Sequence, residues 1–480
     1  RDGLKIYTTL DSKMQEYAEQ AVSEKMKIVQ QNFRSHWGTQ DCWLDDNNRP
    51  IAGFVEDKAR NTPIYHELLA RYPNDLDSVN YYMNQPHMVH LFDYENDSLY
   101  MEMSSMDSVR YMLHFVHCGF IAMEPGNGHV KAWVGDVDFD TWKYDKVRAK
   151  HQPGSTFKLF VYAMAMERGL VPCDRRLDEY IDTLVYNEDK QEMEHWRPTN
   201  ANGTFSGAEM TLRGAFAQSI NSVTVRVAQE VGFGEIAQLA RDMGIKSPME
   251  AKPALSLGAS DVDLMELVNA YCTVVNDGMM HEPVIVTRIV DRDGKEIYRA
   301  PDQQRQAMAY RSAWLMQQML MACRTDAGGT AMALNGYVTR PLYDVDLGGK
   351  TGTSNRHADA WFVAVSPGLV CGSWVGGEYR QIHFRTGALG QGSKTALPIC
   401  GRFLQLVLSD PQFQKYHQRF QPCKEPLNAE LYSGCSALGN IKELDSTMLD
   451  FDEDSLTIPL TDDFNPDEKL EEPSATPDSI

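Results

Sequence analysis

The stretch Pro153-Gly154-Ser155-Thr156-Phe157-Lys158 precedes a run of helix-favouring residues that ends at Gly169. If a helix begins near Ser155, then Ser155 and Lys158 lie one turn apart on the same face. A lysine whose pKa is lowered by burial and by neighbouring positive charge can take the proton of a serine hydroxyl. Taken alone, Ser-x-x-Lys is equally the pattern of a helix cap followed by a surface lysine. The stretch therefore predicts a nucleophile and its base only if other motifs support it.

A second short motif, Ser219-Ile220-Asn221, follows 64 residues after Ser155. A hydroxyl and an amide placed two residues apart can share one cleft. The hydroxyl can relay a proton, and the amide can hold a peptide carbonyl. By itself this motif is weak, because a helix-end cap has the same composition.

The third motif is Gly349-Lys350-Thr351-Gly352-Thr353. Lys350 brings positive charge, and Gly352 permits a substrate backbone to approach an edge strand. A phosphate-binding loop would need Gly-x4-Gly-Lys-[Ser/Thr], but Asp344 stands where the first glycine is required. The motif therefore indicates a substrate-binding strand.

The three motifs in this order are the set found in β-lactamases and penicillin-binding proteins. The chain resembles the transpeptidase portion of a class A, bifunctional penicillin-binding protein, well over 118–408 and moderately over 1–34. The other matching stretches lie along the whole chain: Gly3–Asp11, Gly119–Gly135, Trp196–Pro198, Thr211–Arg213, Ala254–Gly258, Gly328–Thr330, Asp359–Phe362 and Ala396–Ile399.

The resemblance implies an α+β fold of the penicillin-binding protein and β-lactamase type. Strand patterns at both ends with helical patterns between them agree with an antiparallel sheet packed with helices, plus a helical subdomain. We expect helices over 12–32, 155–168, 211–231, 261–276, 310–323 and 397–408. Residues 4–9 predict a strand, and a hairpin is expected over 285–298.

Four segments are expected. Residues 1–34 form a linker strand and helix following an upstream glycosyltransferase domain, and 35–117 form an inserted or subsidiary region. Residues 118–425 form the penicillin-binding transpeptidase domain, and 426–480 a C-terminal extension. From about 440 the extension is acidic and rich in Pro, Ser and Thr, which predicts disorder.

The resemblance also implies roles for particular residues. Ser155 matches the serine that attacks the penultimate D-Ala carbonyl of a stem peptide, and Lys158 the lysine proposed as its base. Ser219 matches the hydroxyl that shuttles protons, and Asn221 the amide that positions substrate. Lys350 matches the lysine that favours the substrate carboxylate.

The third motif also supplies the expected substrate-binding residues. Thr351 and Thr353 match the threonines that bind the carboxylate, with Gly352 between them. The oxyanion hole of the family uses the N–H groups at the positions of Ser155 and Thr353. No metal or organic cofactor is implied. Arg356 and His357, just beyond this motif, are interpreted as turn residues.

The expected activity is that of a serine D,D-transpeptidase, which cross-links peptidoglycan stem peptides through an acyl-serine on D-Ala-D-Ala and is inhibited by β-lactams. Two alternatives stay open: a D,D-carboxypeptidase or β-lactamase on the same fold, and a non-enzymatic penicillin-binding sensor or scaffold. We expect cell-wall synthesis machinery as a possible partner. The expected location is the periplasmic, extracytoplasmic face of the inner membrane. Residue 1 is Arg and no signal peptide is found, so we expect a processed chain or an excised fragment. The resemblance implies a membrane anchor upstream in the parent protein.

The net charge of −21 is unevenly distributed. Residues 441–480 hold 13 Asp and Glu and 2 Lys, a net of −11, which leaves −21 + 11 = −10 for the first 440 residues. This balance disfavours nucleic acid and anionic lipid as partners. The cleft itself is expected to be locally positive because it contains Lys158 and Lys350.

Nine cysteines are present, and no two have the spacing of a Cys-x-x-Cys pair. A zinc knuckle or redox pair is therefore disfavoured. Cys423 and Cys435 could form a disulfide in an oxidising compartment, but two free thiols are the preferred interpretation.

Overall fold

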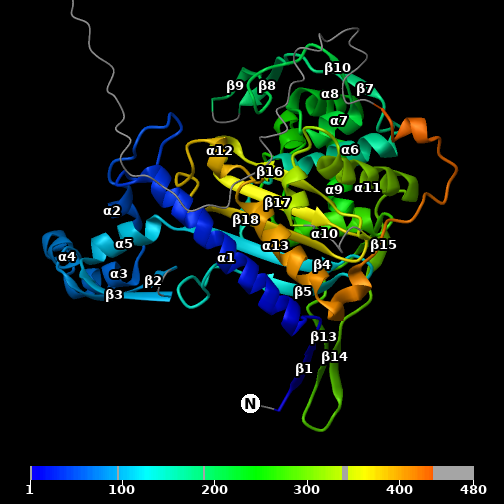
Figure 1. The fold of residues 1–480 in the computed structure, drawn as a ribbon. Helices are drawn as coiled ribbons and strands as arrows, with labels where there is room; N and C mark the ends of the chain where they lie inside the picture. The colour runs from blue at the N-terminus through cyan, green and yellow to red at the C-terminus, as the bar shows by residue number, and fades with distance from the viewer. Residues whose placement is uncertain (1–2, 95–96, 188–189, 338–343, 436–480) are drawn as a thin grey trace, which may run out of the picture. The chain divides into compact units, whose positions relative to one another are not determined.

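A five-stranded antiparallel sheet forms the centre of the fold (Figure 1). The computed structural model describes residues 3–435 except 95–96, 188–189 and 338–343. The strand order is β16 (Gly348–Thr353), β17 (Asp359–Val365), β18 (Val370–Gly377), β4 (Val116–Glu124) and β5 (His129–Val134). Every residue of β17 and β18 is buried, which agrees with their content of Val, Trp and Phe. Strand β16, which carries the third motif, lies at an edge of the sheet as predicted.

Two pairs of helices cover the sheet. Helices α1 (Ser12–Trp37) and α13 (Ala396–Ser409) pack on each other; α1 contacts β4 and β5, and α13 contacts β17 and β18. Helices α10 (Leu264–Val275) and α11 (Tyr310–Thr325) also pack on each other and contact β4, β18 and β16. The sequence predicts the end of the first helix at residue 32, but α1 continues to Trp37 because Phe33 and Trp37 prolong its buried stripe. It stops at Gly38, which has φ 57°.

The helical subdomain contains α6 (Lys158–Glu167), α7 (Leu212–Ala217), α8 (Asn221–Val231) and α9 (Phe233–Asp242). The predicted single helix over 211–231 is wrong, because the chain breaks between α7 and α8. At the break Ser219 has φ 60°, a left-handed conformation that cannot continue a helix. The second motif therefore stands at a junction of two helices, where its side chains can point into a cleft.

Residues 38–116 form a region with its own small core. It contains α2 (Phe54–Ala59), α3 (Pro63–Arg71), α4 (Leu76–Met83), the hairpin of β2 (His87–Asp93) and β3 (Asp97–Met103), and α5 (Ser105–Leu113). Its separate buried cluster consists of Ala59, Leu68, Val79 and Met83. Trp43 is attached to the main core instead, where its ring stacks on that of Phe54 with the centroids 5.4 Å apart.

Short strands complete the fold. Strand β1 (Lys5–Thr8) pairs with β13 (Val286–Val290), which forms the predicted hairpin with β14 (Glu296–Arg299). Four two-stranded sheets pair β6 (Lys150–His151) with β11 (Val262–Asp263), β7 (Arg175–Leu177) with β10 (Glu209–Thr211), β8 (Thr183–Asn187) with β9 (Glu192–Trp196), and β12 (Met279–His281) with β15 (Gln304–Gln306). The short 3₁₀ segments η1 (Gly154–Phe157), η2 (Pro253–Leu257), η3 (Met332–Gly336), η5 (Asn355–His357), η6 (Pro411–Tyr416) and η7 (Ala429–Leu431) connect these elements.

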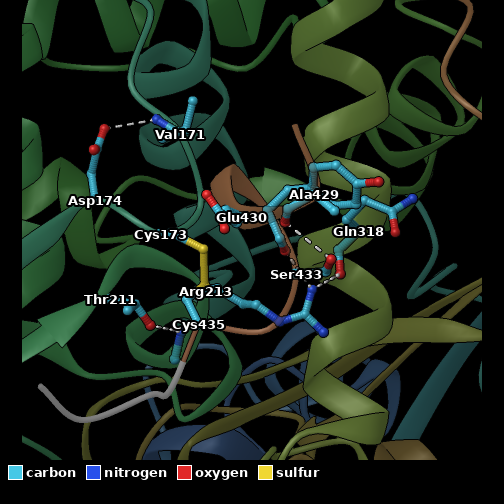
Figure 2. Close-up of a disulfide and its surroundings, with 12 residues drawn as sticks. Val171, Cys173, Asp174, Thr211, Arg213, Gln318, Ala429, Glu430, Ser433 and Cys435 are labelled. Atoms are coloured by element: carbon cyan, nitrogen blue, oxygen red, sulfur yellow. Dashed lines mark hydrogen bonds between the residues drawn. A yellow bond between two sulfur atoms is a disulfide. The ribbon is translucent and has the colours of Figure 1, made fainter. Parts of the chain in front are cut away.

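A disulfide joins Cys173 to Cys435 (Figure 2). The preference for a free thiol at Cys435 is therefore wrong, and so is the pairing with Cys423, which is a free cysteine. Backbone and side-chain contacts support the bond: Cys173 N donates to Leu431 O at 3.1 Å, and Arg213 Nη1 donates to Tyr432 O at 3.2 Å. The C-terminal segment is thus held on the helical subdomain.

None of the described helices combines the length and the apolar character that a bilayer span requires. The predicted disorder from about residue 440 falls outside the described residues.

Candidate functional site

The first motif lies on a tight turn that enters α6. Residues 154–157 form η1, so the predicted helix over 155–168 is 3₁₀ in its first turn. Residues three apart eclipse in a 3₁₀ helix, which places Lys158 above Ser155. Gly154 has φ 51°, and a Cβ there would lie 2.5 Å from Thr353 O. Only glycine therefore allows the first and third motifs to approach so closely.

Hydrogen bonds from distant elements fix this turn. Trp361 Nε1 on β17 donates to Gln152 O at 2.8 Å, and Tyr271 Oη on α10 donates to Thr156 O at 2.9 Å. Both donors are buried in the main core. The position of Ser155 is consequently set by the sheet and by α10, as well as by its own helix.

Lys158 connects the first motif to the second. Its Nζ donates to Ser219 O at 2.7 Å, to Asn221 Oδ1 at 2.6 Å and to Ser219 Oγ at 3.3 Å. The side chain is fully buried. Burial, and then the positive charge of Lys350, hold the pKa of Lys158 well below its usual value. A neutral lysine at this place can accept a proton.

Lys350 approaches the same serine from the sheet. Its Nζ donates to Ser219 Oγ at 2.9 Å and to Thr351 O at 3.1 Å. Burial lowers the pKa of Lys350 to about 8, so at pH 7 this lysine is still mostly protonated. Ser219 Oγ therefore lies between a lysine with a strongly lowered pKa and a mostly protonated lysine, an arrangement suited to proton relay.

Asn221 is held at both ends of its amide. The carbonyl accepts from Lys158, and Nδ2 donates to Thr199 O at 2.7 Å. Its backbone N donates to Asn200 Oδ1 at 2.9 Å, which fixes the start of α8. An amide nitrogen carries two hydrogens, so Nδ2 retains one donor for a ligand carbonyl.

Strand β16 brings the third motif against the first motif. A Cβ on Gly352 would lie 2.4 Å from Pro153 O, so the glycine is required by the close approach of the first motif. Thr353 Oγ1 accepts a hydrogen bond from Gly392 N at 3.1 Å, which leaves its hydroxyl hydrogen for a ligand.

Six of the eight predicted residues line one cavity of about 450 Å³: Ser155, Ser219, Asn221, Thr351, Gly352 and Thr353. The other two, Lys158 and Lys350, are buried and reach Ser219 through hydrogen bonds. The structure therefore brings all eight together. Within the described residues, no hydrogen bond joins Ser155 Oγ to Lys158 Nζ; catalytic hydrogen bonds often shorten only when substrate binds.

Several cavity residues have no role in the sequence analysis. Thr330, whose buried hydroxyl lacks a partner among the described residues, lines the cavity together with Gln218 and Gln391. Arg356 and His357 do lie in a turn, as interpreted, but they also line the cavity. The stretch Gly328–Thr330 is part of the resemblance, and this was the only signal that could have indicated Thr330.

A second cavity of about 330 Å³ adjoins the first. The two share Thr199, Asn221, Thr353, Ser354 and Asn355, and the second extends to Trp196–Pro198 and to Ala254 and Leu257–Ala259. The site is thus a longer groove than the motifs alone indicate. The described residues contain no cluster of three or more His, Cys, Asp and Glu side chains that could hold a metal ion.

Two protein-family models match this chain. Residues 118–368 match the penicillin binding protein transpeptidase domain, and residues 38–116 match the penicillin-binding protein middle domain. The chain therefore belongs to the penicillin-binding protein transpeptidase family. The region interpreted as an insertion corresponds to a domain that the family model describes.

Named relatives agree with this assignment. Penicillin-binding protein 1A of Rickettsia typhi is 30% identical over 85% of this chain and 55% of its own length. Penicillin-binding protein 2D of Bacillus subtilis is 30% identical over 54% of this chain and 37% of its own length. The chain spans about half the length of curated relatives that it matches.

Solved structures show the same fold. Penicillin-Binding Protein 1A from Haemophilus influenzae superposes with a TM-score of 0.63 at 22% identity, covering 88% of this chain and 68% of that one. The penicillin-binding protein PonA1 from Mycobacterium tuberculosis gives a TM-score of 0.57 at 18% identity, covering 91% of this chain and 92% of that one. The predicted α+β fold of the penicillin-binding protein type is confirmed.

Proposed function

We propose that this chain is a serine D,D-transpeptidase that cross-links peptidoglycan stem peptides and is acylated by β-lactams. The observation that carries the proposal is the placement of Ser219 between Lys158 and Lys350, on the wall of the cavity that Ser155 also lines. One lysine has a strongly lowered pKa and the other stays mostly charged, so a base and a cation are available together at neutral pH.

In the acylation step, Ser155 Oγ attacks the carbonyl carbon of the penultimate D-Ala while its proton passes to Lys158. The oxyanion is stabilised by the N–H groups of Ser155 and Thr353. The peptide C–N bond then breaks, and the terminal D-Ala leaves as an amine after receiving a proton through Ser219. Thr351 and Thr353 hold the carboxylate of the departing D-Ala, and the positive charge of Lys350 attracts it.

In the second step, the amine of a neighbouring stem peptide attacks the acyl-ester carbon. A C–N bond forms, the bond to Ser155 Oγ breaks, and the amine proton returns to Ser155 through Lys158. A β-lactam enters the first step but leaves an acyl group that is hydrolysed slowly. Asn221 Nδ2 is placed to hold a carbonyl of the acylated peptide or of the antibiotic side chain.

The proposal extends to the cellular setting. The disulfide between Cys173 and Cys435 is typical of an oxidising compartment, which supports the periplasmic side of the inner membrane. The family assignment supports a membrane-anchored parent protein with an upstream glycosyltransferase domain. Stem peptides, β-lactams and cell-wall synthesis machinery are the proposed partners.

The test is labelling with a fluorescent penicillin, followed by intact mass measurement. We expect one adduct on the wild type and none on Ser155→Ala, whereas Ser23→Ala, at an exposed position on α1, should label normally. No adduct on the wild type, or an adduct that persists on Ser155→Ala, would overturn the proposal.

The products released from stem peptide and from penicillin distinguish a transpeptidase from the alternative functions. Cross-linked product from a pentapeptide donor and an amine acceptor identifies a transpeptidase. Release of D-Ala without cross-linking indicates a D,D-carboxypeptidase, and rapid release of hydrolysed penicillin indicates a β-lactamase. A stable adduct on a protein that leaves stem peptides untouched indicates a sensor.

A further inference from the structure

Arg356 is the only Lys or Arg among the described residues that line the Ser155 cavity, and no Asp or Glu lines it. The cavity wall follows the chain without interruption from Thr351 to His357. The Arg356 side chain is 31% exposed, so it is neither fully buried nor free in solvent. A partly dehydrated guanidinium in an otherwise uncharged wall is a site for an anionic group.

The backbone at this point is unusual. Arg356 has φ 60° and His357 has φ 59°, two consecutive non-glycine residues in the left-handed region. Non-glycine residues persist in this region only where the surrounding structure imposes the conformation. The turn is imposed by the adjacent Ser354, whose Oγ donates to Asp359 Oδ2 at 2.7 Å and accepts from Asp359 N at 2.9 Å.

The ion-pair partner of Arg356 comes from residues 38–116, the middle region of the chain. Asp46 Oδ1 lies 2.6 Å from Arg356 Nη1, and the Asp46 side chain is 88% exposed. The loop that carries Asp46 is anchored next to it, because Leu44 N donates to Gln381 O at 2.9 Å and Trp43 is buried. An exposed ion pair contributes little to stability. The contact does, however, fix where one nitrogen of the guanidinium lies.

The direction of the chain indicates which part of a substrate meets Arg356. Resting on the function proposed above, the side chains of Thr351 and Thr353 hold the terminal carboxylate of the donor peptide, and the N–H groups of Ser155 and Thr353 hold the attacked carbonyl. The wall continues beyond Thr353 through Ser354 to His357, and along it the residues that precede the attacked D-Ala can reach Arg356.

We propose that Arg356, oriented by Asp46, binds a carboxylate in the donor stem peptide upstream of the acylated D-Ala, and so selects acidic donors. A guanidinium has five N–H donors, and one Asp46 oxygen cannot occupy all of them. A carboxylate is its preferred planar partner. Asp46 is a positioning residue in this arrangement, and the middle region thereby contributes to substrate choice.

The test uses two synthetic peptides that end in D-Ala-D-Ala and differ only in the preceding residue, which bears either a side-chain carboxylate or the matching carboxamide. The measurement is kcat/KM for D-Ala release. We expect the wild type to prefer the acid about tenfold, as one charge-assisted hydrogen bond would give. Arg356→Gln should bring the ratio near one, mainly through KM.

Further variants separate the contribution of Arg356 from that of Asp46. Arg356→Lys keeps the charge and should retain part of the preference, which preserves the test if Arg356→Gln fails to fold. Asp46→Asn should lower the ratio, and Asp46→Glu should keep it. The matched control is Asp41→Asn, which breaks an ion pair with Arg110 of 2.8 Å in the same region and should leave the ratio unchanged.

The results distinguish this inference from the function on which it rests. A wild type that forms no penicillin adduct overturns the proposed function. A wild type that is acylated but shows no preference overturns the inference alone, as does a preference that survives in Arg356→Gln. A ratio in Asp46→Asn equal to that of the wild type overturns the role of Asp46.

Discussion

The transpeptidase part and the middle region of this chain use burial in opposite ways. The transpeptidase part encloses two lysines completely, and this burial lowers the pKa of both. The middle region has a separate core of four residues, and its Asp46, which pairs with the cavity residue Arg356, is almost fully exposed. The proposed acid–base groups depend on a dry, dense surrounding, because burial shifts their pKa, whereas the proposed positioning residue Asp46 can act from the surface.

Replacement of Lys158 by Met should have the largest effect, because it removes the proposed base and keeps the volume. We expect the rate of penicillin acylation to fall by about 10²–10⁴-fold. Stopped-flow labelling measures it, with the exposed Lys246→Met as the matched control. A loss smaller than tenfold would show that the buried lysine is not the base.

Core substitutions test whether the two regions are separate units. Phe160→Ala on α6 should destabilise the protein by about 3–5 kcal/mol and abolish labelling at 37 °C, because α6 carries Lys158. Met83→Ala should cost about 2–5 kcal/mol in the middle region while labelling persists. Hydrogen exchange and labelling of the same samples measure both effects. Loss of labelling in Met83→Ala would mean that the two cores unfold together.

Loss of the disulfide should have an intermediate effect on stability. We expect Cys173→Ser and Cys435→Ser each to lower the free energy of unfolding by about 2–4 kcal/mol. Urea unfolding measures the change, and Cys423→Ser, which removes a free thiol, is the control. Equal stability of all three variants would show that the bond does not stabilise the fold.

The pH dependence of the acylation rate should follow the protonation of Lys350. Lys350 is charged below its pKa of about 8 and neutral above it, so the charge that we propose favours the substrate carboxylate is lost as the pH rises. Acylation should therefore decline above pH 8 by up to tenfold per unit. In Lys350→Arg, any remaining activity should lack this decline, because arginine stays protonated. A wild-type rate that stays flat to pH 10 would contradict this role.

Deletion of residues 441–480 should have the smallest effect. This segment carries a net charge of −11 and none of the motifs. We expect the acylation rate to stay within experimental error of the full chain, measured with the same penicillin. A large decrease would place the segment in the catalytic unit.

The sequence predicted the parts of the site that depend on local chemistry. The three motifs, the edge position of β16 and the eight named residues follow from short patterns and from the family resemblance. The strand and helix order around them was largely predicted as well, because the sheet strands are rich in β-branched and aromatic residues.

The remaining features depend on long-range contacts that leave no local pattern. The break at Ser219 needs a left-handed residue whose side chain is held by Lys158 and Lys350, so helix propensity alone predicts a continuous helix. Cys173 and Cys435 are 262 residues apart, and no spacing rule pairs them. Asp46 and Arg356 likewise meet only after folding.

The disulfide also changes the covalent topology of the chain. Residues 173–435 become a closed ring that contains the second and third motifs, while Ser155 and Lys158 lie on the open segment before it. A single proteolytic cut anywhere inside the ring leaves all fragments attached to one another. Nicked molecules would therefore migrate at full mass on a denaturing gel until a reductant is added, and a fluorescent penicillin would then mark only the fragment that carries Ser155.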